Sequence, residues 1–165
     1  MPREPARDHA PAPGLDQLKP VVDSLRTGLK DKLVAAVLFG SRARGDARPD
    51  SDWDILVLAH GLPEKAFERH LFLKRALPDE WRGKVTLLAK TPAEFEARLP
   101  PLYLDIALDG VILYDRGGYM KERLASLQRL IKEKGLRREQ RGRELIWHSE
   151  AYPATDWQSS WEHAR

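Results

Sequence analysis

The sequence predicts a single α/β (α+β) domain, because short apolar runs that suit strands alternate along the chain with segments of helical spacing. The chain has 165 residues, which is the usual size of one domain, and its hydrophobic share of 42% is enough for a core. It contains no cysteine, so disulfides and thiolate metal sites are excluded. A bound metal would need oxygen or histidine ligands, and hard cations such as Mg²⁺ fit that requirement.

Charge and hydropathy narrow the classes of protein further. The net charge of +3 is modest for this length and does not by itself identify a nucleic-acid binder. The N-terminus lacks the apolar stretch of a signal peptide, and the longest aliphatic run, Leu33–Phe39, is too short to span a bilayer. We therefore expect a cytoplasmic protein that does not associate with a membrane.

Five elements are predicted in the first half of the chain. Apolar positions at helical spacing predict a helix over Leu18–Leu29. The continuous apolar run Leu33–Phe39 suits a strand covered on both faces, whereas the density of turn-forming residues predicts a loop without regular structure over Gly40–Ser51. Aromatic and branched residues predict a second strand over Trp53–Leu58, and a helix follows from about Glu64 to Leu77.

The next strand and helix carry the clearest boundary signal. Lys84–Lys90 is predicted as a strand. It is followed by an N-cap threonine, Thr91, a first-turn proline, Pro92, and a capping-box glutamate, Glu94. This combination predicts that a helix begins at Pro92.

Two helices and one strand are predicted between residues 102 and 135. A short helix is predicted over Leu102–Leu108, with Gly110 as the left-handed residue that ends it. A strand over Val111–Tyr114 follows. An apolar stripe from Met120 to Ile131 then predicts a helix of about four turns that Gly135 closes.

The predicted organisation has three parts. Residues 1–14 are rich in proline and charge and are expected to be a disordered tail, residues 15–135 form the domain, and residues 136–165 form a basic, tryptophan-containing extension without a clear pattern. We interpret the basic run Arg137–Arg143 as the solvated end of a helix in preference to an RNA-binding surface. The extension is expected to dock on the domain or on a partner. Its tryptophans are Trp147, Trp157 and Trp161.

A pair of carboxylates stands at the head of the second strand. Side chains alternate along a strand, so Asp52 and Asp54 are expected on one face and Trp53 on the other. Two neighbouring carboxylates repel each other, and a divalent cation readily offsets that cost. Mg²⁺ held by one or two carboxylates commonly completes its shell with substrate phosphates. The pair predicts a metal and a polyphosphate.

The turn after the first strand supplies groups that suit phosphate. Gly40 lets backbone N–H groups approach a ligand closely, and Ser41 adds a hydroxyl donor beside it. Arg42 and Arg44 add positive charge, and Arg44 is the preferred phosphate contact of the two. The loop is long enough to return, so we expect the turn and the carboxylates to face one another across adjacent strands.

The segments Gly40–Gly45 and Ser51–Asp54 resemble the Gly-Ser-x10-Asp-x-Asp signature of the DNA polymerase β superfamily of nucleotidyltransferases. The resemblance covers roughly Leu15–Asp115. Within the superfamily, the chain looks most like the minimal nucleotidyltransferases. These are small prokaryotic proteins, often antitoxins of HEPN-domain ribonuclease toxins, that transfer AMP from ATP to a toxin tyrosine.

The resemblance implies a small mixed sheet packed with helices and a metal-dependent transfer from ATP or another nucleoside triphosphate. It implies that Gly40 and Ser41 hold the β- and γ-phosphates and that Asp52 and Asp54 hold Mg²⁺ and carry the catalysis. Its implied partner is a HEPN-type toxin.

The sequence departs from the family pattern at the third carboxylate, which usually lies on the following strand. Thr86 occupies that position here. Asp105 and Asp109 could replace the missing acid only if their helix carried them to the site. The alternative function is therefore a nucleotide-binding antitoxin or regulator that performs no chemistry and acts by covering its partner.

Overall fold

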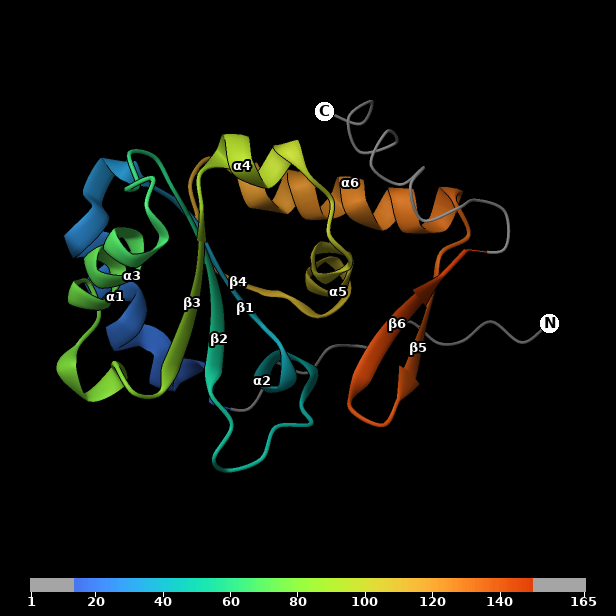
Figure 1. The fold of residues 1–165 in the computed structure, drawn as a ribbon, viewed down its shortest axis with the longest axis horizontal. Helices are drawn as coiled ribbons and strands as arrows, with labels where there is room; N and C mark the ends of the chain where they lie inside the picture. The colour runs from blue at the N-terminus through green and yellow to red at the C-terminus, as the bar shows by residue number, and fades with distance from the viewer. Residues whose placement is uncertain (1–13, 150–165) are drawn as a thin grey trace.

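A computed structural model describes residues 14–149 of the chain (Figure 1). The predictions for residues 1–13 and for Trp157 and Trp161 lie outside the described residues. Within the described range, the predicted alternation of strands and helices is confirmed. The helical segments Leu15–Leu18, Lys30–Lys32 and Asp79–Trp81 are single 3₁₀ turns that connect the longer elements.

Four strands form one mixed sheet in the order β3-β2-β1-β4. They are β1 (Leu33–Phe39), β2 (Trp53–Ala59), β3 (Val85–Lys90) and β4 (Val111–Asp115). Strand β1 pairs antiparallel with both β2 and β4, whereas β2 and β3 are parallel. A parallel neighbour requires a crossover connection, and the helix between β2 and β3 provides it. Strand β1 is central and almost fully buried, as its continuous apolar sequence predicts.

Two helices cover one face of the sheet. Helix α1 (Lys19–Leu29) and helix α3 (Ala66–Arg75) lie together on the left in Figure 1. The buried side chains of α1 recur at helical spacing and pack, together with Leu73 of α3, against Ile55 and Val57 of β2. This layer confirms the helices predicted from Leu18 and from Glu64.

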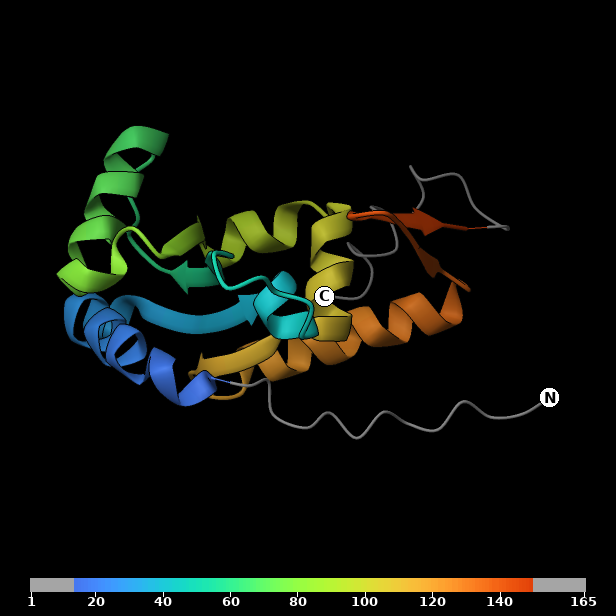
Figure 2. The same cartoon turned by 90° about the horizontal axis from the view of Figure 1, so that it is seen from below.

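Three helices cover the opposite face, and Figure 2 shows them together on the side away from α1 and α3. They are α4 (Pro92–Ala97), α5 (Pro101–Asp109) and α6 (Tyr119–Glu133). The predicted capping box is present, because the Thr91 hydroxyl accepts from the Glu94 amide and the Glu94 carboxylate accepts from the Thr91 amide. No helix within residues 14–149 has the length and apolar character needed to cross a membrane.

Two predictions about glycine-rich segments are wrong. The segment Gly40–Ser51 is not wholly irregular, because Ser41–Arg44 forms one helical turn, α2, between Gly40 and Gly45. Gly110 is not left-handed, since its φ is −59°. A Cβ atom at Gly110 would instead collide with the carbonyl oxygen of Ile106. Glycine is needed at position 110 because the backbone there passes directly against the last turn of α5.

The segment after Gly135 also differs from its prediction. Residues Arg137–Arg141 form β5 and Glu144–His148 form β6, and the two pair antiparallel as a separate hairpin. The basic run is therefore a strand and a turn, not the end of a helix. Gly142, at φ 61°, begins the two-residue turn, which suits the twist of a hairpin.

Candidate functional site

The turn at the end of β1 lies directly against a carboxylate of β2. In the antiparallel register Phe39 stands opposite Asp54, so the next residue, Gly40, leaves the strand beside that side chain. Gly40 has φ 73°, a conformation that L-residues rarely adopt, and a Cβ atom there would collide with Asp54 Oδ2. The predicted meeting of turn and carboxylate across adjacent strands is thus present in the structure.

Helix α2 leaves its first amides available to a ligand. The carbonyl of Gly40 accepts hydrogen bonds from the amides of Ala43 and Arg44, at 3.1 and 3.0 Å. The amides of Ser41 and Arg42 precede these first intrahelical donors, as the opening N–H groups of any helix do. Together with the Ser41 hydroxyl they form a small cluster of donors next to Asp54.

The two arginines of α2 have different surroundings. Arg42 donates to the carbonyls of Ser51, at 2.8 Å, and Pro49, at 3.2 Å, and its guanidinium lies over the Trp53 ring. It therefore braces the loop between α2 and β2. Arg44 forms an ion pair with Asp46 at 3.3 Å. Burial raises the pKa of Asp54, and the charge of Arg44 offsets part of that rise.

The carboxylate pair has the predicted arrangement. Trp53 is buried against the α1–α3 face, while Asp52 is exposed and Asp54 is partly buried on the other side of the strand. Burial raises the pKa of Asp54, and the charge of Asp52 raises it further, against the opposing effect of Arg44. Thr86 of β3 lies beside Asp54 in the register and donates from Oγ1 to Asp52 Oδ2 at 3.1 Å.

These residues fit a hard divalent cation. The two carboxylates are adjacent and one of them is partly buried, so ionising both is unfavourable unless a cation binds between them. Mg²⁺ accepts one or two protein carboxylates and takes its remaining ligands from phosphates and water. Between Gly14 and Ser149 no group of three or more metal-ligating His, Asp or Glu side chains is present. The donor set is therefore the pair itself, and substrate phosphates would have to complete the shell.

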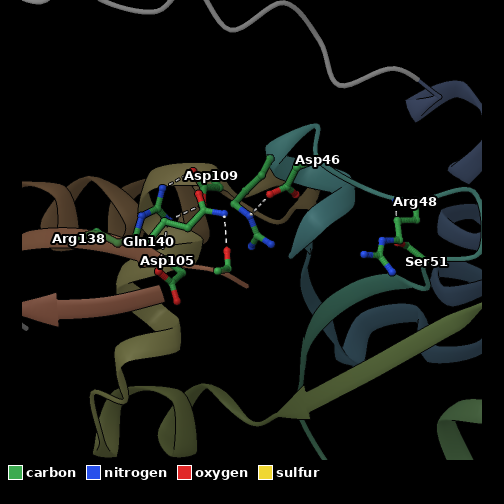
Figure 3. A network of polar contacts seen from close by, with 9 residues as sticks. Asp46, Arg48, Ser51, Asp105, Asp109, Arg138 and Gln140 are labelled. Carbon is green, nitrogen blue, oxygen red and sulfur yellow. Dashed lines mark hydrogen bonds and ion pairs between the residues drawn. The ribbon is translucent and has the colours of Figure 1, made fainter. Parts of the chain in front are cut away.

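Asp105 and Asp109 of α5 do not supply a third acid. Both carboxylates bind Arg138 of β5, at 3.2 Å for Asp105 Oδ1 and 3.0 Å between Asp109 Oδ1 and Arg138 Nη2 (Figure 3). The hydrogen bond with Asp109, followed by smaller contributions from Asp105, raises the pKa of Arg138. The hypothesis that the helix brings these aspartates to the metal is not supported, because both bind Arg138 of the hairpin.

Trp147 completes the attachment of the hairpin to α5. It is the cross-strand partner of Arg138, and its Nε1 donates to Asp105 Oδ1 at 3.0 Å. Sequence reasoning missed this contact, although one signal was available. Gly142 and Arg143 separate two segments of strand length, and a two-residue turn that begins with glycine is typical of a hairpin.

The fold and the site agree with the match to known families. Residues 25–117, more than half of the chain, match the family described as "Polymerase beta, Nucleotidyltransferase". The chain therefore belongs to the polymerase β-type nucleotidyltransferases, and the resemblance of the motif is confirmed.

Two curated relatives come from Methanocaldococcus jannaschii. The "Putative protein adenylyltransferase MJ1305" is 31% identical over 106 residues, which cover 62% of this chain and 72% of that protein. The "Putative protein adenylyltransferase MJ0141" is 43% identical over 49 residues, which cover 30% of this chain and half of that protein. Both relatives carry the name of an enzyme that adenylylates proteins.

Solved structures similar to this chain include a "putative nucleotidyltransferase from Sulfolobus solfataricus", with 27% identity and a TM-score of 0.46 over 62% of this chain and 80% of that one. A toxin-antitoxin complex with AMP-PNP has 21% identity and a TM-score of 0.49 over 69% and 90%. A complex of a tri-AMPylated Shewanella oneidensis HEPN toxin with an MNT antitoxin has 21% identity and a TM-score of 0.44 over 70% and 87%. Because these TM-scores are low, the family assignment rests on the sequence matches.

Proposed function

We propose that this nucleotidyltransferase transfers AMP from ATP to a hydroxyl group of a partner protein, with Mg²⁺ as its cofactor. The observation that carries the proposal is the contact of the Gly40 turn with Asp54, because it brings phosphate donors and carboxylates to one place. The name of the curated relative MJ1305 supports a protein as the acceptor and an adenylyl group as the cargo.

In the proposed reaction the acceptor hydroxyl oxygen forms a bond to the α-phosphorus of ATP. The bond from that phosphorus to the oxygen that bridges to the β-phosphorus breaks, and pyrophosphate leaves with the electron pair. The hydroxyl proton passes to a carboxylate of the site or to water. When bound, Mg²⁺ would neutralise the charge that develops on the attacking and leaving oxygens.

Each residue of the site has a proposed part in this reaction. Gly40 and Ser41 would bind the β- and γ-phosphates through backbone amides and the hydroxyl, and Arg44 would add charge beside them. Asp52 and Asp54 would hold Mg²⁺. The hydroxyl of Thr86 would orient Asp52 but supplies no negative charge for the ion.

The test uses ATP labelled at the α-phosphate, MgCl₂ and the protein encoded by the neighbouring gene. We expect label on that protein, and its loss with the Asp54→Asn variant. Asp50→Asn is the matched control, since Asp50 is an exposed aspartate of the same loop. Absence of transfer to the partner at saturating ATP would contradict the proposal.

We further propose a HEPN-type toxin as the partner, on the resemblance of the motif to the minimal nucleotidyltransferases. Thr86 in place of an acid favours a second candidate, in which the chain binds nucleotide and neutralises its partner by covering it. Neutralisation that persists in Asp52→Asn and Asp54→Asn would support covering, whereas neutralisation lost while the complex still forms would support transfer. The expected cytoplasmic location stays a prediction.

A further inference from the structure

Strand β3 forms one edge of the sheet, and half of the backbone N–H and C=O groups of β3 point away from the neighbouring strand β2. The Lys84 carbonyl accepts from the Trp53 amide on the β2 side, whereas the Ala89 carbonyl accepts from Arg69 Nη1 on the outer side, at 3.3 Å. Backbone groups alternate in direction along a strand, so Val85 and Leu87 share the outward direction of Ala89. The edge therefore presents N–H and C=O groups that could pair with another strand.

A groove runs along this edge, between β3 and α3, which lie beside each other in Figure 1. Its volume is about 480 Å³. Its floor is apolar and includes Leu73, Leu77 and Leu87. The volume is large enough to hold several side chains, and the floor would favour apolar ones.

The rim of the groove is basic. Its cationic side chains and histidine are Arg69, His70, Lys74, Arg82 and Lys90, and its acids are Glu64 and Glu94. Glu94 is already bound to Arg69 at 2.7 Å, and Arg82 is bound to Asp79 at 2.7 Å. Lys74 and Lys90 have no ion pair with any residue of the described range. The groove therefore carries a surplus of positive charge, which is complementary to an acidic ligand.

The groove leads to the candidate site. Thr86 contributes to its lining and donates a hydrogen bond to Asp52 at 3.1 Å. An added strand would direct alternate side chains toward the α3 side and toward the side that holds the carboxylates. Apolar side chains could then fill the floor of the groove while a hydroxyl-bearing neighbour reaches Asp52.

Apolar side chains next to the groove fit a protein ligand. Phe67 and Leu71 of α3 are 71% and 37% exposed. They follow the lining residues Ala66 and His70 by one position each, which places them on the adjoining stripe of the helix. A partner that lies in the groove could cover these side chains.

We propose that the acceptor presents its hydroxyl on an extended, acidic segment of polypeptide, which binds the outer edge of β3 as an additional strand. This inference rests on the proposed function and specifies its acceptor. Main-chain hydrogen bonds to Val85 and Leu87 would provide affinity, and the basic rim would select acidic sequences.

The proposal is tested with a fluorescein-labelled peptide of about nine residues in which glutamate and valine alternate around a central tyrosine. A matched peptide carries lysine in place of glutamate. Fluorescence anisotropy should show the acidic peptide binding at least about ten-fold more tightly than the basic one. Equal affinity of the two peptides, or no binding of the acidic one, would overturn the inference.

Charge reversal locates the binding surface. The Lys74→Glu/Lys90→Glu variant should bind the acidic peptide about ten-fold more weakly, and Lys121→Glu/Lys132→Glu on the exposed face of α6 should bind it unchanged. If the first variant fails to fold, Lys74→Gln/Lys90→Gln should still weaken binding by about three-fold. An unchanged affinity in a folded groove variant would overturn the inference.

Amide hydrogen exchange and nucleotide binding separate this inference from the proposed function. Exchange at Val85 and Leu87 should slow on addition of the acidic peptide, and unchanged exchange there would contradict strand addition. Binding of a fluorescent ATP analogue should be equal in the groove variants and the parent chain. Peptide binding at the groove without any ATP binding would refute the proposed function, while the groove would still be a binding site for an acidic, extended peptide.

Discussion

Asp52, directly before β2, and Asp54 on β2 form one pair of carboxylates, and Asp105 and Asp109 on α5 form another. Arg138 binds both members of the second pair, and Trp147 donates a further hydrogen bond to it. In residues 14–149 the first pair has no ion pair of its own and receives only the hydroxyl of Thr86. Its deeper member has a raised pKa, because it is buried beside a like charge.

The difference separates a structural site from a site prepared for a ligand. A carboxylate pair that binds a guanidinium within the chain has its charge balanced before any ligand arrives. A pair that forms no ion pair leaves most of that balance to a ligand, so its unfavourable charge prepares the site for a cation. The two pairs should therefore respond in opposite ways to substitution.

The largest effect is expected at the β2 pair. Asp52→Asn or Asp54→Asn should reduce AMP transfer by on the order of a thousand-fold, because each removes a proposed ligand of Mg²⁺. The melting temperature should stay equal or rise in Asp54→Asn, since a desolvated charge is removed. Labelled-ATP assays and thermal unfolding measure the two properties. A marked drop in the melting temperature would show that this pair, like the other, stabilises the fold.

At the α5 pair the expected effect falls on stability. Arg138→Met should lower the free energy of unfolding by about 2–3 kcal/mol, because it leaves two poorly exposed carboxylates without their cation. Urea unfolding measures the change. Adding Asp109→Asn to this variant should restore part of the loss, since one uncompensated charge is removed. A single variant as stable as the parent would mean that the attachment of the hairpin adds no stability.

Glycine substitutions compare the two ends of α2. Gly40→Ala and Gly45→Ala both place a side chain at positive φ, 73° and 85°. Gly45, at ψ 13°, is left-handed, where a side chain should cost about 1–2 kcal/mol, whereas Gly40, at ψ −158°, lies in a region essentially restricted to glycine, where the cost should reach about 3 kcal/mol. Only the first would also displace the Asp54 carboxylate, because a Cβ atom at Gly45 meets nothing within 4 Å. ATP binding, measured by calorimetry, should be lost in Gly40→Ala and retained in Gly45→Ala. Equal binding would contradict the role proposed for the turn.

The smallest effect concerns Glu94, whose pKa is lowered from 4.5 to about 2, chiefly by its hydrogen bonds with Arg69. Because the pKa falls on folding, the pair stabilises the protein above pH 4.5, and this contribution is lost as the pH falls toward about 2. Glu94 is 42% exposed, so the contribution should stay below about 1 kcal/mol. Unfolding free energies measured across this range should depend less on pH in Arg69→Met. Identical profiles for variant and parent would exclude the effect.

The sheet and its helices were predictable because their signals are local. Leu33–Phe39 is apolar throughout since both faces of β1 are covered, and Thr91 with Glu94 marks a helix start through contacts within one turn. The juxtaposition of Gly40 and Asp54 followed from the spacing of the motif and from strand alternation. These features need no knowledge of distant parts of the chain.

The missed features depend on contacts between distant residues or on very short elements. Helix α2 has four residues, too few for a periodic pattern, and its flanking glycines favoured a loop. Strand β5 exposes most of its side chains, so it shows no alternation of apolar and polar residues. The binding of Arg138 to Asp109, across 29 residues, depends on the docking of the hairpin on α5. The spacing of residues along the sequence does not predict that docking.

The parallel pairing of β2 with β3 has a consequence for how the site assembles during folding. Phe39 and Asp54 meet through a short antiparallel connection, whereas Thr86 and Asp52 are 34 residues apart and can meet only after α3 has crossed over the sheet. Contacts of low sequence separation close with less loss of chain entropy and tend to form first. We therefore expect a folding order in which the β1–β2 half of the site forms before β3 brings Thr86 to it.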